Sequence, residues 1–248
     1  MAFVDELEKQ GQWLFRWRSY IPLIIIPIFI LSLQTPEQLE QIAGDTIEDI
    51  YEMICFFIAF IGLGIRCITV AFVPKGTSGR NTKKQKAKRL NTTGMYSITR
   101  NPLYLGNFFI ILGIVMFTQS LLAIITIILV FWIYYERIIF AEEQFLQKKF
   151  GKKFLQWANN TPIFIPNFKN YRAPDLSFSL KNIFKREYTG FFIIILTFTV
   201  VEILEDYFDK RQFKIEREWA IIFIVGLITY ILLRYLKKKT NLLNEEGR

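Results

Sequence analysis

Polar side chains gather where the chain enters one of its long apolar runs. The stretch TGMYSITRNPLYLG (residues 93–106) spaces Tyr96, Arg100 and Tyr104 at intervals of four residues, and an Asn-Pro step precedes the second tyrosine. Proline suits the first position of a helix, where its missing N–H costs nothing, and Asn101 suits the cap position before it. Because a helix N-terminus presents free N–H groups, it can bind an anion or a polar cofactor. The stretch therefore predicts a polar site at a helix entry.

Two carboxylates follow on the next predicted helix. The apolar run Leu121–Ile139 continues with a helical period through Glu142 and Glu143 up to Gly151, a residue that suits a helix C-terminus. Only Gln119-Ser120 separate this run from the one before it. The resulting hairpin should return both carboxylates to the side on which the polar stretch lies.

The composition places most of the chain in a bilayer. The 248 residues are 52% hydrophobic and include 25 phenylalanines, and a spanning helix needs about 20 apolar residues. We therefore expect an all-α, polytopic integral membrane bundle of about six transmembrane helices, with a tight helical hairpin between spans three and four. The predicted spans are Tyr20–Leu33 (extended N-terminally by Trp13–Trp17), Ile50–Val73, Leu103–Thr118, Leu121–Ile139, Tyr188–Leu204 and Trp219–Leu236.

The distribution of charge predicts the orientation. Residues 74–102 hold eight Lys and Arg and no acid, whereas residues 34–49 hold five acids and no base. The excess of Lys and Arg places segment 74–102 in the cytoplasm, and an even number of spans then places both termini there. The net charge of +9 is explained by this topology, so we expect no nucleic-acid partner. A composition rich in Ile, Lys, Phe and Asn favours a bacterial inner membrane.

The chain has no histidine and only two cysteines, both in the second predicted span. This composition excludes His-ligated zinc and haem sites, Ser-His triads and a Cys metal cluster, so we expect no metal site. Any reaction must proceed without imidazole as a base or a ligand.

Two arginines lie inside predicted spans. Arg66 precedes Val73 by seven residues, which places it about 10 Å inside the second span. Arg137 follows Glu136 near the end of the fourth. Charged residues in a bilayer are costly and often functional, although Arg66 could instead extend to the headgroups and Glu136 could form a structural pair with Arg137. We take Arg66, Glu136 and Arg137 as candidate catalytic residues.

The order of the polar residues resembles that of a known enzyme group. The pattern G-x-Y-x-x-x-R-N-P-x-Y-x-G, then an apolar span, E-E, F-G and a proline-containing turn, is similar to the isoprenylcysteine carboxyl methyltransferase and phospholipid methyltransferase superfamily. The resemblance covers about Thr92–Phe168, and Asn101 stands where many members have histidine. It implies S-adenosylmethionine (SAM) as methyl donor. The residues it implies for the SAM pocket are Gly94, Tyr96, Arg100, Asn101, Pro102, Tyr104, Gly106, Glu142 and Glu143.

The resemblance and the composition together predict a function. We expect a SAM-dependent integral membrane methyltransferase that acts at the cytoplasmic interface on a membrane lipid or lipidated substrate. The acceptor would be a carboxylate, a phosphate or an amine headgroup, and the lack of histidine favours an oxyanion, which needs no general base. Two alternatives stay open: an NADPH-dependent sterol or steroid-type reductase, and a non-enzymatic transporter or scaffold.

The predicted organisation has three parts. Residues 1–91 form a two-span region with a basic cytoplasmic linker, and residues 92–168 form the methyltransferase core with the SAM site. Residues 169–248 supply a cytoplasmic connector and two C-terminal spans.

Overall fold

The regular structure of this chain is helical. The computed structural model describes residues 2–18, 30–32, 44–74, 76–77, 85, 87–211, 213 and 215–247, and within them every regular element is a helix. The all-α prediction is therefore confirmed. The elements are α1 (Phe3–Trp17), α4 (Asp45–Ala71), α5 (Met95–Ile98), α6 (Pro102–Phe117), α7 (Leu121–Phe150), α8 (Lys152–Asn160), the 3₁₀ helix η2 (Phe168–Asn170), α9 (Leu180–Lys210) and α10 (Arg217–Lys239).

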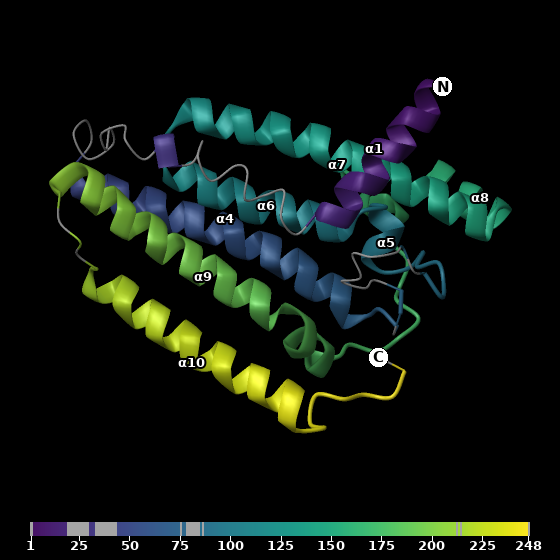
Figure 1. Cartoon of the computed structure of the whole chain (residues 1–248). Helices are drawn as coiled ribbons and strands as arrows, with labels where there is room; N and C mark the ends of the chain where they lie inside the picture. Colours follow the sequence, from purple (N-terminus) through teal and green to yellow (C-terminus); the bar gives the residue numbers. More distant parts are fainter. Residues whose placement is uncertain are drawn as a thin grey trace.

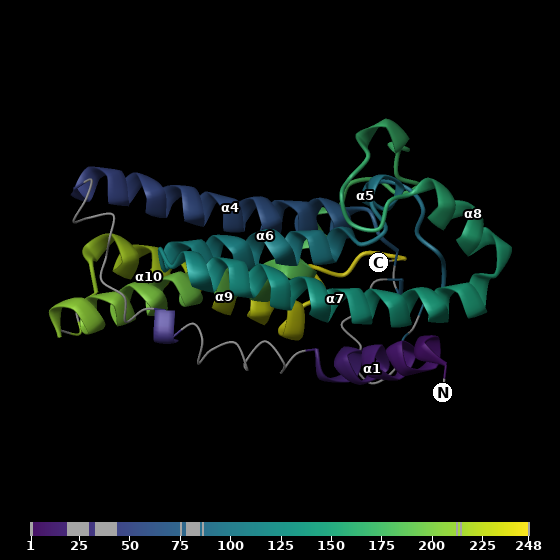
Figure 2. The same cartoon turned by 90° about the horizontal axis from the view of Figure 1, so that it is seen from above.

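Five long helices form the body of the molecule. Helices α7, α6, α4, α9 and α10 lie side by side in that order (Figure 1). Helix α1 packs along the part of α7 that extends beyond α6, and α5 and α8 lie at the same end of the bundle (Figure 2). The start of α1 and the end of α10 also lie at this end (Figure 1). We call it the α5–α8 end.

Three described helical segments are long and apolar enough to cross a membrane: Thr46–Ala71, Leu121–Phe150 and Arg217–Lys239. Helix α6 is apolar but has only 16 residues, and α9 contains the predicted fifth span. Most of the predicted first span, Tyr20–Leu33, lies outside the described residues. The bundle is therefore polytopic, and a total of six spans stays a prediction.

Small residues bring α4 and α6 into backbone contact. A Cβ atom on Gly62 would lie 2.4 Å from the carbonyl oxygen of Gly106, and one on Gly113 would lie 2.5 Å from that of Cys55. Glycines at such a crossing let two membrane helices approach closely. This contact fixes the height of Arg66 on α4 relative to the start of α6.

The two C-terminal helices share the main hydrophobic core. Phe198 of α9 stacks on Trp219 of α10 with ring centroids 6.2 Å apart, and it meets Phe117 of α6 edge-on at 5.2 Å. Cys55 and Ala59 of α4 are fully buried in the same cluster. These helices are therefore packed against the bundle and help to position its polar end.

Several predicted boundaries are confirmed and two are wrong. Pro102 is the first residue of α6, and α7 is one continuous helix capped by Gly151 at a φ of 52°. However, Trp13–Trp17 belongs to α1, which ends at Trp17. Helix α9 begins at Leu180, eight residues before the predicted fifth span, because the Ser179 side chain accepts a hydrogen bond from the Asn182 N–H. The first two turns of α9 were expected to be part of the connector.

Candidate functional site

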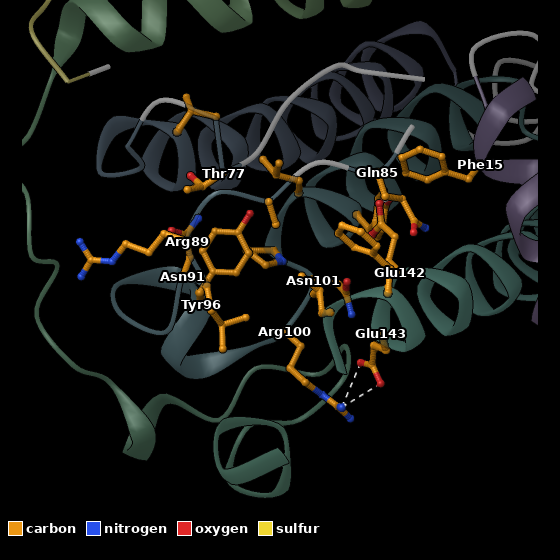
Figure 3. Close-up of a pocket in the computed structure, with 18 of the residues that line it drawn as sticks. Phe15, Thr77, Gln85, Arg89, Asn91, Tyr96, Arg100, Asn101, Glu142 and Glu143 are labelled. Carbon is orange, nitrogen blue, oxygen red and sulfur yellow. Dashed lines mark hydrogen bonds and ion pairs between the residues drawn. The ribbon is translucent and has the colours of Figure 1, made fainter. Parts of the chain in front are cut away.

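A cavity of about 570 Å³ lies at the α5–α8 end of the bundle, between α1, α4, α6, α7, α8 and α9 (Figure 3). Pockets of roughly 300–1,000 Å³ are typical of small-molecule and cofactor sites. The lining is rich in charge, with arginines and glutamates contributed by several different elements.

The first polar pair on the cavity wall joins the loop before α6 to α7. Arg100 Nη1 lies 2.9 Å from Glu143 Oε1 and 3.0 Å from Oε2, and Figure 3 shows the two side chains facing each other. The backbone N–H of Arg100 donates to the Pro162 carbonyl at 2.9 Å, which fixes the arginine at the turn after α8. Arg100 Nε is buried and has no hydrogen-bond partner among the described residues. The wall thus offers an unused donor beside a carboxylate.

The second polar pair lies one residue earlier on α7. The Tyr104 hydroxyl donates to Glu142 Oε1 at 2.9 Å, and Arg18 Nη1, just after α1, lies 3.6 Å from the same oxygen. The Tyr104 ring packs against Tyr135 with centroids 4.6 Å apart. Glu142 is therefore held between a neutral donor and a cation, both of which line the cavity.

The third polar cluster joins α4, α6 and α9. Arg66 donates from Nε to Glu187 Oε2 at 2.8 Å and from Nη2 to Oε1 at 3.0 Å. Its Nη1 donates to Asn107 Oδ1 at 2.7 Å, and Asn107 Nδ2 donates to the Tyr135 hydroxyl at 3.0 Å. The cluster therefore connects the C-terminal helix α9 to the tyrosine pair beside Glu142.

Helices α5 and α8 close the cavity on the remaining side. Trp157 Nε1 donates to the Tyr96 carbonyl at 2.9 Å, and both residues line the cavity. Burial raises the pKa of the Tyr96 hydroxyl to about 12, so this phenol stays neutral at physiological pH. Gly94 adopts a φ of 59°, which favours glycine, and its N–H donates to the Arg172 carbonyl at 2.8 Å.

Asn101 holds the cap position of α6 in a different way from the one predicted. Its side chain makes no cap hydrogen bond, and Nδ2 instead donates to the Ile163 carbonyl at 3.0 Å. The Asn101 carbonyl accepts the first α6 backbone bonds, from Tyr104 and Leu105. The prediction of a side-chain cap is therefore wrong: the amide instead ties the start of α6 to the turn after α8.

Most of the predicted site residues meet at this cavity. Gly94 and Gly106 are not part of the wall, but a Cβ on Gly106 would lie 2.5 Å from Arg66 Cγ, so this glycine makes room for the arginine. The predicted residues that line the cavity are Arg66, Tyr96, Arg100, Asn101, Pro102, Tyr104, Glu142 and Glu143.

Glu136 and Arg137 are not brought to the cavity. They pair with each other at 3.2 Å, and the Glu136 side chain is 56% exposed. Tyr135 and Glu142 are seven residues apart, close to two helical turns, so they share a face of α7 that Glu136 and Arg137 do not. The geometry gives no support to a catalytic role for these two residues, and we do not retain it.

Five lining residues that the sequence reasoning missed come from three regions. Arg186 and Glu187 directly precede the predicted fifth span, and Arg18 directly follows Trp13–Trp17, the predicted extension of the first span. A signal existed for the other two: Asn107 is a lone amide in an apolar run, three residues after Tyr104, and Tyr135 precedes Glu142 by seven. All five line the cavity.

Comparison with known proteins identifies a family that matches part of this chain. Residues 54–153 match the family model of the phospholipid methyltransferases. This match, together with the similarity to two yeast isoprenylcysteine methyltransferases, supports the resemblance to the isoprenylcysteine carboxyl methyltransferase and phospholipid methyltransferase superfamily. The matched region holds Arg66, the motif around Arg100 and both carboxylates of α7, whereas Arg18 and Glu187 lie outside it. The resemblance inferred from the motif is therefore confirmed.

Individual relatives match about half of this chain or less. The cobalt-zinc-cadmium resistance protein CzcN of Cupriavidus metallidurans is 33% identical over 111 residues, which cover 45% of this chain and 51% of that protein. The nickel-cobalt-cadmium resistance protein NccN of Alcaligenes xylosoxydans xylosoxydans is 31% identical over 46% of this chain and 54% of its own length. The chain thus spans about half the length of these curated relatives.

An enzyme is also among the relatives. The protein-S-isoprenylcysteine O-methyltransferase of Saccharomyces cerevisiae is 32% identical over 85 residues, which cover 34% of this chain and 36% of the enzyme. No solved structure matches the chain.

Proposed function

We propose that this protein is a SAM-dependent methyltransferase that acts on a lipid-borne acceptor at the cytoplasmic face of a membrane. The observation that carries the proposal is the cavity at the α5–α8 end, where the motif residues Arg100 and Tyr104 meet the carboxylates of α7. The match of residues 54–153 to the phospholipid methyltransferase family and the similarity to the yeast enzyme support the reaction type. A bacterial inner membrane, with both termini in the cytoplasm, is part of the same proposal.

The donor groups of the cavity fit SAM. When bound, SAM supplies an electrophilic methyl group on a sulfonium centre. Glu142 and Glu143 are acceptor-only groups when ionised, and they suit hydroxyl or ammonium donors of a cationic ligand. Arg100 Nε and Gln85 Nε2 are buried donors without partners in the described part of the chain, and both side chains line the cavity. They suit a carboxylate on the same ligand.

The residues of this cavity would act mainly by positioning. Holding two reactants in a reactive geometry can supply about 7–11 kcal/mol of the barrier. No histidine is available as a base. An anionic acceptor oxygen needs none, whereas an amine would have to give its proton to a glutamate such as Glu142. We therefore propose an acceptor with an anionic oxygen. The name of the yeast relative, an O-methyltransferase, likewise indicates an oxygen acceptor for that enzyme.

The decisive experiment is a calorimetric titration of the detergent-purified protein with S-adenosylhomocysteine, the demethylated product of SAM. We expect micromolar binding in the wild type and a loss of about tenfold or more in Glu143→Gln, since a hydrogen bond to a charged group contributes about 1.5–3 kcal/mol. The Glu142→Ala/Glu143→Ala double variant should abolish binding.

A matched control separates this loss from a general effect of removing a charge. Glu8→Gln removes an ion-paired glutamate that joins α1 to α7 through Lys148 at 2.7 Å, outside the cavity wall, and should leave the affinity unchanged. A folded wild type that binds no S-adenosylhomocysteine would refute the proposal. Binding of NADPH by that same protein would favour the reductase alternative.

A further inference from the structure

Arg66 is held in a fixed orientation by two helices other than its own. Glu187 of α9 accepts two of its hydrogen bonds, and Asn107 of α6 accepts a third. A guanidinium carries five N–H donors in one plane, so three contacts from two directions determine both its position and its rotation. Two N–H donors of Arg66 have no role in these contacts.

The two members of the ion pair differ in how far they are covered. The Arg66 side chain is 17% exposed, whereas that of Glu187 is 4% exposed. Both line the cavity, together with Asn107. The guanidinium is thus the more accessible group of the pair, and two of its N–H donors are not used in the three hydrogen bonds to Glu187 and Asn107.

This cluster lies apart from the pairs assigned to the cofactor. Arg100 and Glu143 are joined to each other, and Glu142 is joined to Tyr104 and Arg18. Within the described part of the chain, hydrogen bonds and ring packing link the Arg66 cluster to these groups through Asn107 and Tyr135, whose ring packs on Tyr104. The cavity therefore has two differently built polar walls.

We propose that Arg66 binds an anionic oxygen of the acceptor headgroup, and that Glu187 is the positioning residue that aims it. The inference rests on the proposed function for the meaning of "acceptor", and it assigns a role to α9, which lies outside the matched residues 54–153. Arg66 suits the task because a guanidinium can engage a carboxylate or a phosphate with two parallel hydrogen bonds. Asn107 supports the same orientation from the opposite side.

Two variants of Glu187 distinguish its effect on the orientation of Arg66 from its effect on the local charge. Glu187→Asp keeps the negative charge but withdraws the carboxylate by one methylene, and Glu187→Gln keeps the length but loses the charge and one acceptor atom. If Glu187 aims Arg66, both variants weaken anion binding. If Glu187 only neutralises Arg66, Glu187→Gln tightens anion binding, because a nearby like charge is removed, and Glu187→Asp has no effect.

The experiment is calorimetric titration of the full chain in nonionic detergent with three single-chain probes: dodecyl phosphate, dodecanoate and dodecyltrimethylammonium. We expect the wild type to bind at least one anionic probe about tenfold or more tightly than the cationic probe. Comparing the phosphate with the carboxylate then shows which headgroup the site prefers. Glu187→Asp, Glu187→Gln and Arg66→Lys should each weaken the preferred probe by about tenfold.

Binding of S-adenosylhomocysteine and the thermal midpoint are measured on the same samples. The affinity for S-adenosylhomocysteine should stay at the wild-type value in the Glu187 variants, and Glu8→Gln should change neither affinity. Three results would each overturn the proposal. The first is a wild type that prefers the cationic probe, and the second is tighter anion binding in Glu187→Gln. The third is a Glu187 variant that loses affinity equally for the anionic probe and S-adenosylhomocysteine and has a lowered thermal midpoint. A wild type that selects anions but does not bind S-adenosylhomocysteine would refute the methyltransferase function and leave the anion site standing.

Discussion

The close contact between α4 and α6 predicts opposite effects on stability for alanine substitutions at two glycines of α4. Gly62 faces α6: a Cβ there would lie 2.4 Å from the Gly106 carbonyl oxygen and 2.7 Å from the Ile110 backbone nitrogen. Gly64, two residues later, has nothing within 4 Å of the same position. Substitution by alanine should therefore destabilise the protein at Gly62 and stabilise it at Gly64.

The magnitudes follow from these distances. At Gly62 the nearest atom lies about 1 Å inside ordinary contact distance, and it belongs to backbone, which cannot rotate away. Overpacking of this kind costs about 1–3 kcal/mol. At Gly64 only the backbone preference remains, and alanine in a helix is favoured over glycine by about 0.5–1 kcal/mol.

Thermal unfolding in detergent measures both effects. For a chain of this length 1 kcal/mol corresponds to about 2–4 °C in the midpoint, so Gly62→Ala should lower it by several degrees and Gly64→Ala should raise it slightly. Gly62→Ala should also weaken S-adenosylhomocysteine binding, because α6 carries Tyr104 and must move away from α4. Equal midpoints for the two variants would refute the close backbone contact from which the argument starts.

Two further substitutions test single hydrogen bonds of the cavity wall. Tyr104→Phe removes the hydroxyl that donates to Glu142 and should weaken S-adenosylhomocysteine binding by about five- to tenfold; calorimetry showing the wild-type affinity would contradict a role for this bond. Trp157→Phe leaves the Tyr96 carbonyl without its donor, which should cost about 1–3 kcal/mol and lower the thermal midpoint. The same change at Trp13, whose side chain is 56% exposed on α1, should leave the midpoint unchanged.

The sequence was most informative where one local rule decided the structure. Pro102 and Gly151 mark helix ends because each residue restricts or permits a particular backbone conformation, and both ends were predicted correctly. The two-residue link between the apolar runs predicted the hairpin, and hence the meeting of Arg100 with Glu143. The order and spacing of the motif residues were sufficient to predict the resemblance that the family match supports.

Contacts between distant segments could not be predicted in the same way. Nothing near Glu187 in the sequence indicates that it meets Arg66, 121 positions earlier. The start of α9 depends on the Ser179 cap, which the sequence analysis did not predict. Arg186 and Glu187 were therefore not predicted to lie on a helix that lines the cavity. The predicted catalytic role of Glu136 and Arg137 is not supported for a different reason. The prediction used only their position in an apolar span, whereas the face of α7 on which they lie decides whether they reach the cavity.

Three ion pairs of the described residues have both partners in the cavity wall, and they share a feature that bears on how the site is built. Arg18 and Glu142 join α1 to α7, Arg66 and Glu187 join α4 to α9, and Arg100 and Glu143 join the start of α6 to α7. Each pair therefore ties together segments that are distant in the sequence.

Removing one partner of a partly buried ion pair leaves a charge without compensation, whereas the intact pair adds little net stability. The main effect of these pairs is therefore to orient the charged side chains of the cavity wall, and their contribution to stability is small. Arg18 and Glu187 lie outside the region that matches the family model, so two of these three orientations depend on residues beyond the matched region. The matched region therefore supplies the motif, and the flanking helices α1 and α9 supply partners that orient it.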